Sequence, residues 1–578
     1  MKTLYKEQRE IKTGKKIKQI SGAEAVVKSL LAEGVELIFG YPGGAIMPVY
    51  DALLSGGSKL RHVLVRHEQG AIHAAQGYAR AKRGTGVCLV TSGPGATNLV
   101  TGLADAKIDS TAVVCITGQV NSALLGSDAF QETDIIGLTL PVTKWSIQVT
   151  QAAEIMPAIA KAFYIAGSGR PGPVLIDITK DAQSGMCEDA YQPCRTIKNY
   201  YPKPSVDQKQ LRSAAELLSA AERPLVLAGQ GVHLSGAQRE LLSLAEKGNL
   251  PVASTLLGLS CFPADHALYA GFLGMHGNYA PNLMTNACDV LLAVGMRFDD
   301  RVTGELSRYA KQARIIHIDI DASEFGKNVK PEIAMHADAR EALAGLAQFV
   351  KRKPRTDWLN KMKELKKTEY EAVTEKEFFP AAGPVRMAEA IRMLDQLTAG
   401  KALLLTDVGQ HQMSASRYYR FTQTDSYITS GGLGTMGFAL PAAVGAQLAC
   451  ADRPVVAVTG DGGVQMNIQE LATIFQENIP VKIMILNNNY LGMVRQWQEL
   501  FFEKRYSSVE MVNPDFVKLA QAYGITALAV RDRDKLRKAM HTMLESPGPF
   551  LLEVVVEKEE NIFPMIPPGC SVSEVRLS

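Results

Sequence analysis

The pattern of apolar and polar residues is most informative in the last third of the chain. An apolar run at 455–458 ends in Gly460-Asp461-Gly462, and a second apolar run at 481–486 ends in three asparagines. Between the two runs, apolar residues from Ile468 to Phe475 recur at helical spacing. This order predicts strand, turn, helix and strand, the unit from which parallel sheets are built.

A similar layout occurs near the N-terminus. Ser21 and Glu24 have the spacing of a capping box, which predicts a helix that continues to about residue 33. A strand at 37–39 then enters the glycine-rich turn 40–44. The further predicted elements of this segment are a strand at 62–66, a helix at 71–82, a strand at 87–90, a helix ending near 107, and strands at 112–117 and 174–178.

The middle and the last third complete the predicted fold, which is α/β with three doubly wound parallel-sheet domains. Apolar runs at 224–228, 251–254, 290–294, 314–318 and 402–406 predict strands. The charged stretch 351–380 predicts a solvated connector helix. The expected division is a disordered arm at 1–20, a first domain at 21–185, a linker at 186–205, a central domain at 206–350, a linker at 351–380, a third domain at 381–556 and a tail at 557–578.

Composition and charge narrow the possible functions. The chain has 578 residues, 46% hydrophobic and 21% charged residues and a net charge of +3, which is ordinary for a globular protein and gives no case for binding nucleic acid. No apolar run has membrane-spanning length, and the lysine-rich start lacks the apolar core of a signal peptide. The eight cysteines form no C-x-x-C pair, and several lie in apolar strands, which predicts a reducing, cytoplasmic setting.

Asp461 and Asn488 follow two predicted neighbouring strands directly. Open α/β sheets bind ligands at this edge, and one carboxylate with one neutral oxygen ligand suits Mg²⁺ held against a diphosphate. The alternative is that Gly460-Asp461-Gly462 is an ordinary turn and that the asparagines cap the next element. For the glycine motif alone that alternative is favoured, whereas the complete pattern favours the metal site.

Longer motifs carry a resemblance to a known family. The clearest are HEQGA, TSGPGATN, RFDDRVTG, GDGGVQMNIQELATI and NNNYLGMVRQWQ. From about residue 21 to residue 564 the chain resembles the catalytic large subunits of the acetohydroxyacid synthase (acetolactate synthase) family of thiamine-diphosphate (ThDP) enzymes. The resemblance implies pyrimidine-binding (PYR) and diphosphate-binding (PP) domains that flank an FAD-binding domain. It also implies decarboxylation of pyruvate and carbon–carbon bond formation with a second pyruvate or 2-ketobutyrate, in valine, leucine and isoleucine biosynthesis.

The resemblance also implies roles for particular residues. Glu68 would exchange a proton with the aminopyrimidine ring of ThDP, whereas a first-turn glutamate can also simply complement the helix dipole. Gly44 and Gln131 would line the reacting centre, and Asp461, Asn488 and the backbone carbonyl of Tyr490 would hold Mg²⁺. The other residues implied to contact ThDP are Gly409, Gln410, His411, Gly434, Met436, Gly460, Gly462, Gly463 and Met493.

Further residues are implied for FAD and substrate. Arg301 would hold the acceptor carboxylate, and the substrate channel would be shaped by Phe130, Lys180, Met275 and Trp497. The alternative is that Phe130, Met275 and Trp497 are plain core residues and that Lys180 is a solvated charge. The central segment departs from the family at Gly229-Gln230-Gly231, where three glycines are common, and at Ala322 and Ala337. The residues implied to contact FAD are Arg170, Gly229, Gly231, Thr255, Leu256, Met275, His276, Gly295, Arg297, Asp299, Arg301, Asp319, Ile320 and Asp338.

The resemblance implies partners as well. A homodimer or homotetramer would share each active site between two chains, and a small regulatory subunit is a further expected partner. Two other functions remain open from the residues alone. One is a flavin-linked redox enzyme such as a pyruvate oxidase, and the other is a non-catalytic relative, against which the intact Glu68, Asp461 and Asn488 argue.

Overall fold

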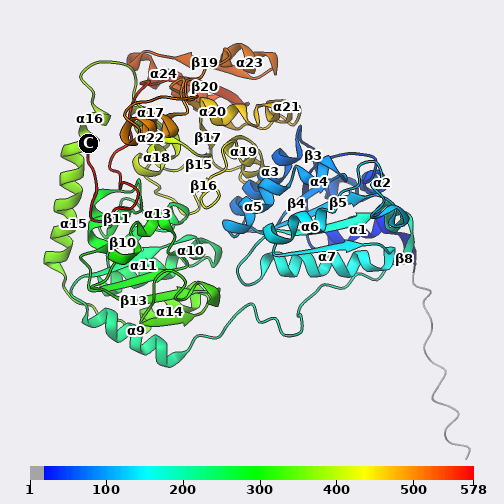
Figure 1. The fold of residues 1–578 in the computed structure, drawn as a ribbon, viewed down its shortest axis with the longest axis horizontal. Coiled ribbons are helices and arrows are strands. Elements are labelled where there is room, and N and C mark those ends of the chain that lie inside the picture. Colours follow the sequence, from blue (N-terminus) through cyan, green and yellow to red (C-terminus); the bar gives the residue numbers. More distant parts are fainter. Residues whose placement is uncertain (1–17) are drawn as a thin grey trace, which may run out of the picture.

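The computed structural model describes residues 18–578 and contains three sheets of six strands, one in each predicted domain (Figure 1). Every pairing within these three sheets is parallel, and helices cover both faces of each sheet. The predicted fold class is therefore confirmed. Alternate residues of one strand pack into different cores: Cys88 and Val90 lie on one face of the first sheet and Val87 and Leu89 on the other.

The N-terminal domain has the strand order β3-β2-β4-β5-β7-β6. Its capping box is confirmed, since Ser21 and Glu24 bond each other's backbone at the start of the first helix. The strands are β2 (Leu37–Tyr41), β3 (Arg61–Leu64), β4 (Gly86–Val90), β5 (Val113–Gln119), β6 (Trp145–Val149) and β7 (Val174–Thr179), and the helices are α1 (Gly22–Ala32), α2 (Met47–Gly56), α3 (Glu68–Lys82), α4 (Pro94–Thr97), α5 (Val100–Ile108), α6 (Ile135–Thr139), α7 (Ala152–Gly167) and α8 (Lys180–Ser184).

The ends of this domain differ from the prediction. Residues 1–17 of the expected arm lie outside the described residues, but Gln19–Ser21 forms strand β1. It pairs antiparallel with β8 (Met186–Glu188), which was expected to begin a linker. The single helix expected to end near residue 107 is divided into α4 and α5 at Asn98 and Leu99.

The central domain has the strand order β11-β10-β9-β12-β13-β14. Two of its predicted strands have the expected bounds, because each is a run of residues buried on both faces. The strands are β9 (Pro224–Ala228), β10 (Val252–Ser254), β11 (Tyr269–Phe272), β12 (Val290–Val294), β13 (Arg314–Asp319) and β14 (Ile333–His336), and the helices are α9 (Gln208–Ala220), α10 (Gln230–Leu234), α11 (Gln238–Gly248), α12 (Tyr279–Thr285), α13 (Asp300–Thr303) and α14 (Ala339–Phe349).

The charged connector is helical but is not wholly solvated. Helix α15 (Thr356–Glu369) buries Trp358, Met362 and Leu365 in the core of the central domain. The Trp358 indole donates a hydrogen bond to the carbonyl of Pro224 at 2.8 Å. One face of the helix therefore packs, and most of its charged residues are exposed, whereas Glu369 is buried and accepts hydrogen bonds from Asn278 and Tyr279. The short helix α16 (Glu375–Phe378) follows.

The C-terminal domain has the strand order β16-β15-β17-β18-β20-β19. Its strands are β15 (Leu403–Thr406), β16 (Tyr427–Thr429), β17 (Val455–Gly460), β18 (Lys482–Asn487), β19 (Thr526–Val530) and β20 (Phe550–Val555). Its helices are α17 (Met387–Thr398), α18 (Gln410–Tyr418), α19 (Ala439–Ala449), α20 (Asp461–Gln465), α21 (Leu471–Gln476), α22 (Gly492–Phe501), α23 (Phe516–Ala522) and α24 (Arg533–Glu545).

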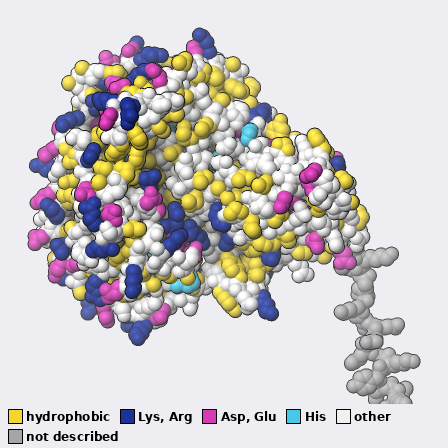
Figure 2. Space-filling view, viewed as in Figure 1, with side chains coloured by type: hydrophobic (Ala, Val, Ile, Leu, Met, Phe, Trp, Pro, Cys, Tyr) yellow, Lys and Arg dark blue, Asp and Glu magenta, His cyan; other side chains and the backbone are white. Residues whose placement is uncertain are grey.

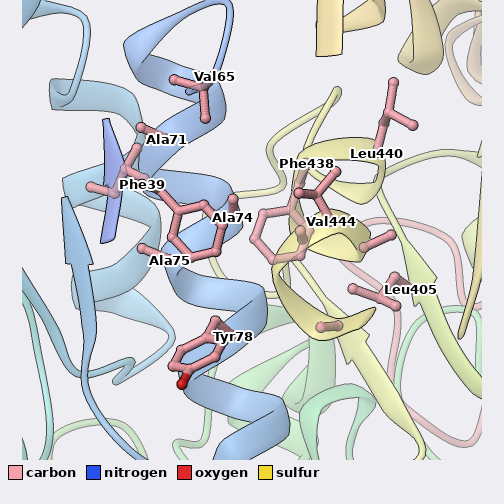
Figure 3. Packing of buried hydrophobic residues seen from close by; sticks show 14 of the residues in the cluster. Phe39, Val65, Ala71, Ala74, Ala75, Tyr78, Leu405, Phe438, Leu440 and Val444 are labelled. Atoms are coloured by element: carbon pink, nitrogen blue, oxygen red, sulfur yellow. The ribbon is translucent and has the colours of Figure 1, made fainter. Parts of the chain in front are cut away.

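Helices α3 and α19 join the N- and C-terminal domains. Figure 3 shows Ala74 of α3 directed towards Phe438, which precedes α19, whereas Ala71 and Tyr78 lie on the side of Phe39. Glycines allow this close approach: a Cβ at Gly77 would lie 1.9 Å from the Ala442 carbonyl oxygen, and one at Gly445 would lie 1.8 Å from that of Ala74. One continuous core therefore runs through both domains.

Five of the eight cysteines, at 88, 115, 187, 261 and 288, are buried thiols, as the apolar context of several predicted. Within residues 18–578, none of the helices has both the length and the apolar character that crossing a bilayer requires.

Candidate active site

A narrow cleft lies at the carboxyl ends of β17 and β18. These strands are parallel neighbours, and Gly460 at the end of one pairs with Leu486 near the end of the other. Asp461 follows β17 as the first residue of α20, and Asn488 follows β18. Both side chains line the cleft, which encloses about 60 Å³. The predicted order of strand, turn, helix and strand is confirmed and brings Asp461 and Asn488 to the same cleft.

Most residues implied to contact ThDP or the metal line this cleft. The exception within the C-terminal domain is Gly434, which lies on the wall of a second, larger cavity. Its φ of +74° is a backbone conformation that favours glycine. The predicted residues on the cleft wall are Gly409, Gln410, His411, Met436, Gly460, Asp461, Gly462, Gly463, Asn488, Tyr490 and Met493.

The Asp461 carboxylate is almost fully buried, with 2% of the residue exposed. Asn513 donates its side-chain N–H to Asp461 Oδ2 at 2.7 Å and to Asn487 Oδ1 at 3.1 Å. Burial raises the pKa of Asp461, and the Asn513 bond opposes that rise. Asn513 was not predicted, because it lies on a later loop that no motif marks.

Asn488 belongs to a network of neutral amides. Its Nδ2 donates to Gln410 Oε1 at 3.2 Å, and its Oδ1 accepts from the Tyr490 N–H at 3.2 Å. Gln410 in turn donates to Gln496 Oε1 at 3.0 Å and to the Glu560 carbonyl at 2.7 Å. The C-terminal tail therefore fixes Gln410, which supports the amide beside Asp461.

Asp407 is a further residue that the sequence did not identify. His411 Nε2 lies 2.5 Å from Asp407 Oδ1, and the Gly437 N–H donates to Asp407 Oδ2 at 2.9 Å. A Cβ at Gly463 would lie 1.9 Å from Asp407 Oδ2, so a side chain at that position would displace the carboxylate. The available signal was its place directly after the predicted strand 402–406.

Glu68 lies apart from this cleft, at the first residue of α3. Asn98 Nδ2 donates to Glu68 Oε2 at 2.9 Å, and a Cβ at Gly95 would lie 3.3 Å from Glu68 Oε1. Gln131, held at a φ of +60°, packs its backbone against Gly93. The glycine turn at 93–95 and Asn98 therefore lie next to Glu68.

The structure separates the two halves of the predicted site. Every residue of the cleft wall belongs to the stretch from Met387 to Val494, so the N-terminal domain of the same chain contributes none of them. Gly44 is exposed, and a Cβ there would meet no atom within 4 Å. Among residues 18–578, no group of three or more His, Cys, Asp or Glu side chains is placed to hold a metal ion. Among the described residues that line the cleft, Asp461 is the one with a carboxylate.

The larger cavity encloses about 920 Å³ between the central domain and the other two. Figure 2 shows Lys and Arg side chains gathered in the hollow between the N-terminal lobe and the rest of the molecule. Gly229 does not line the cavity, because it packs with its Cα facing the backbone of Gly295 and Met296. The residues implied for FAD that do line it are Arg170, Gly231, Thr255, Leu256, Met275, His276, Gly295, Arg297, Asp299, Arg301, Asp319, Ile320 and Asp338.

Burial shifts the pKa values of two ionisable side chains that line the larger cavity. Burial raises the pKa of Asp319 to about 6 and lowers that of His276 to about 3, so the imidazole is neutral at pH 7. Within the described part of the chain, His276 Nδ1 is buried and has no hydrogen-bond partner. Arg170 pairs with Glu324 at 2.8 Å across the junction of the N-terminal and central domains.

The residues implied for substrate are only partly brought together. Arg301, Met275 and Trp497 line the larger cavity, and Arg301 Nη1 lies 3.5 Å from the Met275 sulfur. Met493 lines both the cavity and the cleft, one helical turn from Trp497. Phe130 is 88% exposed and Lys180 is exposed, and neither lines either space. Phe130 is thus not a core residue of this chain.

Comparison with known proteins agrees with the division of the chain into three α/β domains. Three profiles of the thiamine pyrophosphate (ThDP) enzymes match the chain: the N-terminal TPP binding domain at residues 20–138, the central domain at 211–346 and the C-terminal TPP binding domain at 407–554. A probable acetolactate synthase large subunit of Methanocaldococcus jannaschii is 46% identical over 565 residues, which covers 96% of this chain and 95% of that protein.

Two further relatives have similar coverage. The acetolactate synthase isozyme 2 large subunit of Escherichia coli is 46% identical over 562 residues, 96% of this chain and 99% of its own. The acetolactate synthase large subunit of Lactococcus lactis is 43% identical over 559 residues, 96% of each chain. The chain therefore belongs to the thiamine pyrophosphate enzymes and, within them, to the family of acetolactate synthase large subunits.

Proposed function

We propose that this protein is an acetolactate synthase. It decarboxylates pyruvate and joins the remaining two carbons to a second pyruvate or to 2-ketobutyrate, giving 2-acetolactate or 2-aceto-2-hydroxybutyrate for branched-chain amino-acid synthesis. The observation that carries the proposal is the cleft at the ends of β17 and β18, found in a chain 43–46% identical to acetolactate synthase large subunits over 96% of its length.

The cleft fits Mg²⁺ and the diphosphate of ThDP. Asp461 supplies one carboxylate, Asn488 an amide oxygen and Tyr490 a backbone carbonyl, which are the hard oxygen ligands that Mg²⁺ prefers. A cation also offsets the cost of the buried Asp461 carboxylate, whose pKa is raised by burial. When bound, ThDP supplies the electron sink for decarboxylation and carbon–carbon bond formation.

Glu68 acts as the proton-exchanging group, and Asn98 holds its carboxylate in place. Gly44 and Gln131 would line the reacting centre. Because the cleft receives nothing from the N-terminal domain of its own chain, a second copy supplies Glu68 and closes the site. The protein is therefore a homodimer or homotetramer with shared sites, and the large-subunit names of its relatives are consistent with a small regulatory partner.

The direct test is incubation of the purified protein with pyruvate, ThDP and Mg²⁺, followed by identification of the products. Stoichiometric CO2 and 2-acetolactate are expected without an added electron acceptor. Acetate or acetyl phosphate formed only with an electron acceptor would replace this proposal with a pyruvate oxidase. Absence of turnover by protein that binds ThDP would indicate a non-catalytic relative.

FAD fits the larger cavity. Its volume lies within the range of ordinary ligand sites, roughly 300–1,000 Å³. Arg170, Arg297 and the neutral His276 line the cavity, and the two guanidinium groups can bind phosphate. The reaction has no net electron transfer, so the flavin would act as a structural element.

The flavin prediction is that reconstitution with a redox-inert analogue of the same ring shape preserves acetolactate formation. The measurement is turnover of reconstituted protein alongside its flavin and ThDP content. Loss of turnover with both groups bound would give the flavin a redox role. Failure to bind any flavin would assign the cavity to another ligand.

Trp497 should set the preference between the two acceptors, which differ by one methylene. In an apolar pocket that difference is worth about 10- to 200-fold. Trp497 lines the larger cavity one helical turn after Met493, which also lines the cleft, so it stands where an acceptor would approach the cofactor. We expect Trp497→Leu to lower the ratio of 2-aceto-2-hydroxybutyrate to 2-acetolactate several-fold, while pyruvate alone still reacts.

Phe501→Leu is the matched control for Trp497. The two rings contact each other with centroids 5.3 Å apart, but Phe501 does not line the cavity. The product ratio with both acceptors competing should therefore stay unchanged in this variant. If both variants shift the ratio equally, or if Trp497→Leu leaves it unchanged, Trp497 is a packing residue of α22.

A further inference from the structure

The segment from Ser430 to Gly437, called here the partition loop, separates the cleft from the larger cavity. Gly431 to Gly434 line the larger cavity, and Met436 lines the cleft. The loop connects β16 with α19, and it has no helix or strand of its own. Its position therefore depends on what holds it from outside.

Asp109, which follows α5 in the N-terminal domain, accepts hydrogen bonds from one end of the loop. The Gly431 N–H donates to Asp109 Oδ2 and the Gly432 N–H to Asp109 Oδ1, both at 2.7 Å. Asp109 is fully buried. A carboxylate that receives two adjacent backbone N–H groups is a strong and directional acceptor.

Asp105, one helical turn earlier on α5, holds the next part of the loop. Ser430 and Thr435 donate their hydroxyl groups to Asp105 Oδ1, the latter at 2.9 Å, and the Thr435 N–H donates to Ser430 Oγ at 2.8 Å. Arg80 of α3 donates to the Thr429 carbonyl at 2.6 Å and lies 3.9 Å from Asp109. Three buried charged side chains of the N-terminal domain thus surround a loop of the C-terminal domain.

The loop also fits closely against the N-terminal domain. A Cβ at Gly432 would lie 2.7 Å from Ile108 Cγ1, so glycine is needed for this approach. At the other end, the Gly437 N–H bonds to Asp407, and Asn467 Nδ2 donates to the Gly437 carbonyl at 2.8 Å. Met436 therefore lies between the loop's contacts with the N-terminal domain and its contacts with Asp407 and Asn467.

The close packing of α3 against α19 gives the first anchor a fixed position relative to the C-terminal sheet (Figure 3). The N-terminal domain contributes no residue to the cleft wall of its own chain, yet it holds the segment that carries Met436. A change at Asp109 would move the loop without touching the metal ligands.

We infer that Asp105 and Asp109 are positioning residues that set the partition loop, and with it Met436, for ThDP binding in their own chain. This inference rests on the proposed role of the cleft as the ThDP site. It assigns two separate roles to the N-terminal domain. The domain supplies Glu68 to the cleft of a neighbouring chain, and it positions the partition loop beside the cleft of its own chain.

The test is calorimetric titration of full-length protein with ThDP in excess Mg²⁺. Asp109→Asn keeps the size of the side chain but turns one acceptor into an N–H donor facing a backbone N–H. Its ThDP affinity should fall about ten- to hundredfold, since the lost hydrogen bonds involve a charge. Turnover at saturating ThDP should stay within a few-fold of wild type. Unchanged affinity in a folded variant would overturn the inference.

Asp105→Asn should have a smaller effect. The hydroxyls of Ser430 and Thr435 can rotate to suit an amide, whereas the backbone N–H groups facing Asp109 are fixed. Ser430→Ala weakens the same contact from the loop side and should lower ThDP affinity a few-fold, which keeps the test decisive if Asp109→Asn does not fold. Wild-type affinity in both of these variants would count against the anchoring role.

Asp289→Asn is the matched control. Asp289 also accepts two adjacent backbone N–H groups, from Glu222 at 2.8 Å and Arg223 at 2.9 Å, but it lines neither the cleft nor the cavity. ThDP affinity should be unchanged in this variant whatever its unfolding temperature. An equal loss of affinity would reduce Asp109 to a general stabilising contact.

A pH profile gives an independent readout. Burial, together with the neighbouring Asp105, raises the pKa of Asp109 to about 6, whereas Arg80 of α3 and the two loop N–H groups lower it. Tyr427 of β16 faces Arg80, and the Arg297 guanidinium lies near Gly432. Asp109 accepts both N–H groups best when ionised, so wild-type ThDP affinity should fall as pH decreases through about 6.

That step should be missing from Asp109→Asn, which has no proton to gain. Its presence with unchanged size would overturn the inference. Because ThDP binding is measured without turnover, the result is separable from the proposed function. A protein that makes no acetolactate but binds ThDP in an Asp109-dependent way would refute the activity and retain the anchor.

Discussion

Replacing Glu68 by Gln is expected to lower turnover about 100- to 10,000-fold, the range for loss of one general acid–base group. Glutamine fills the same space at the start of α3, and its Oε1 can still accept the hydrogen bond from Asn98. It has no ionisable proton to exchange with the aminopyrimidine ring. ThDP should therefore remain bound while the reaction stalls. The measurements are turnover with pyruvate and ThDP affinity by titration.

Glu24→Gln is the matched control for the helix-dipole alternative. Glu24 is the first-turn acidic residue of α1 in the same domain, and it bonds the Ser21 backbone N–H at 2.8 Å. Loss of its charge should change the stability of a helix terminus and leave turnover nearly unchanged. If Glu68→Gln behaves like Glu24→Gln, Glu68 has no part in the chemistry.

The strands of this protein were predictable where burial is complete. Residues 224–228 and 290–294 form β9 and β12 with the expected bounds, because the interior strands of a parallel sheet are continuous apolar runs. The antiparallel pair β1 and β8 was not predicted. It consists of three-residue strands about 165 positions apart, with mixed polarity and no local turn to mark them.

The residues of the candidate site also differ in whether the sequence predicts them. Asp461 and Asn488 were predictable, since each follows its strand directly and the parallel arrangement fixes where strand ends meet. Asn513 and Asn98 were not, because their contacts with Asp461 and Glu68 depend on loop conformations. Motif positions indicate which residues carry chemistry, whereas the residues that orient them depend on tertiary structure.

Two glycines implied to contact cofactors have a clear role in the backbone packing as well. Gly229 was assigned to FAD, but its missing side chain serves the close packing of two backbone turns. Gly434, implied for ThDP, has a positive φ and lines the larger cavity, whereas Met436 lines the cleft. In both cases the glycine is required by backbone geometry next to the site, which a motif does not distinguish from contact with a ligand.

Replacing Asp461 by Ala should abolish Mg²⁺-dependent ThDP binding, since it removes the carboxylate that this chain places in the cleft. Raising Mg²⁺ should rescue little, because the diphosphate would still face a site without its anionic ligand. Titration of ThDP at several Mg²⁺ concentrations measures this. Wild-type affinity for ThDP would show that the cleft is not the diphosphate site.

Asp461→Asn tests whether the lost charge or a packing defect causes the loss of ThDP binding. Burial raises the pKa of Asp461 above its unfolded value, so the native state holds the proton more tightly and free energy of unfolding rises as pH falls through that window. At pH 7 without metal, the ionised carboxylate therefore costs stability. The Asn variant should unfold at no lower temperature than the cofactor-free wild type, yet should also lose Mg²⁺-dependent binding. A large drop in unfolding temperature would assign the loss of binding to misfolding.

The Asp461→Ala variant also tests whether each site needs two chains. In a mixture with Glu68→Gln protein, subunit exchange produces dimers in which one site combines both defects and the other combines an intact Glu68 with an intact Asp461. Random exchange at equal concentrations makes half of the dimers such hybrids, each with one intact site, so the mixture should recover about a quarter of wild-type activity per chain. Tagged subunits co-purified from the mixture would establish that exchange occurred. Exchange without recovery would mean that Glu68 and Asp461 act within one chain, which the wall of the cleft, formed by residues 387 to 494 alone, argues against.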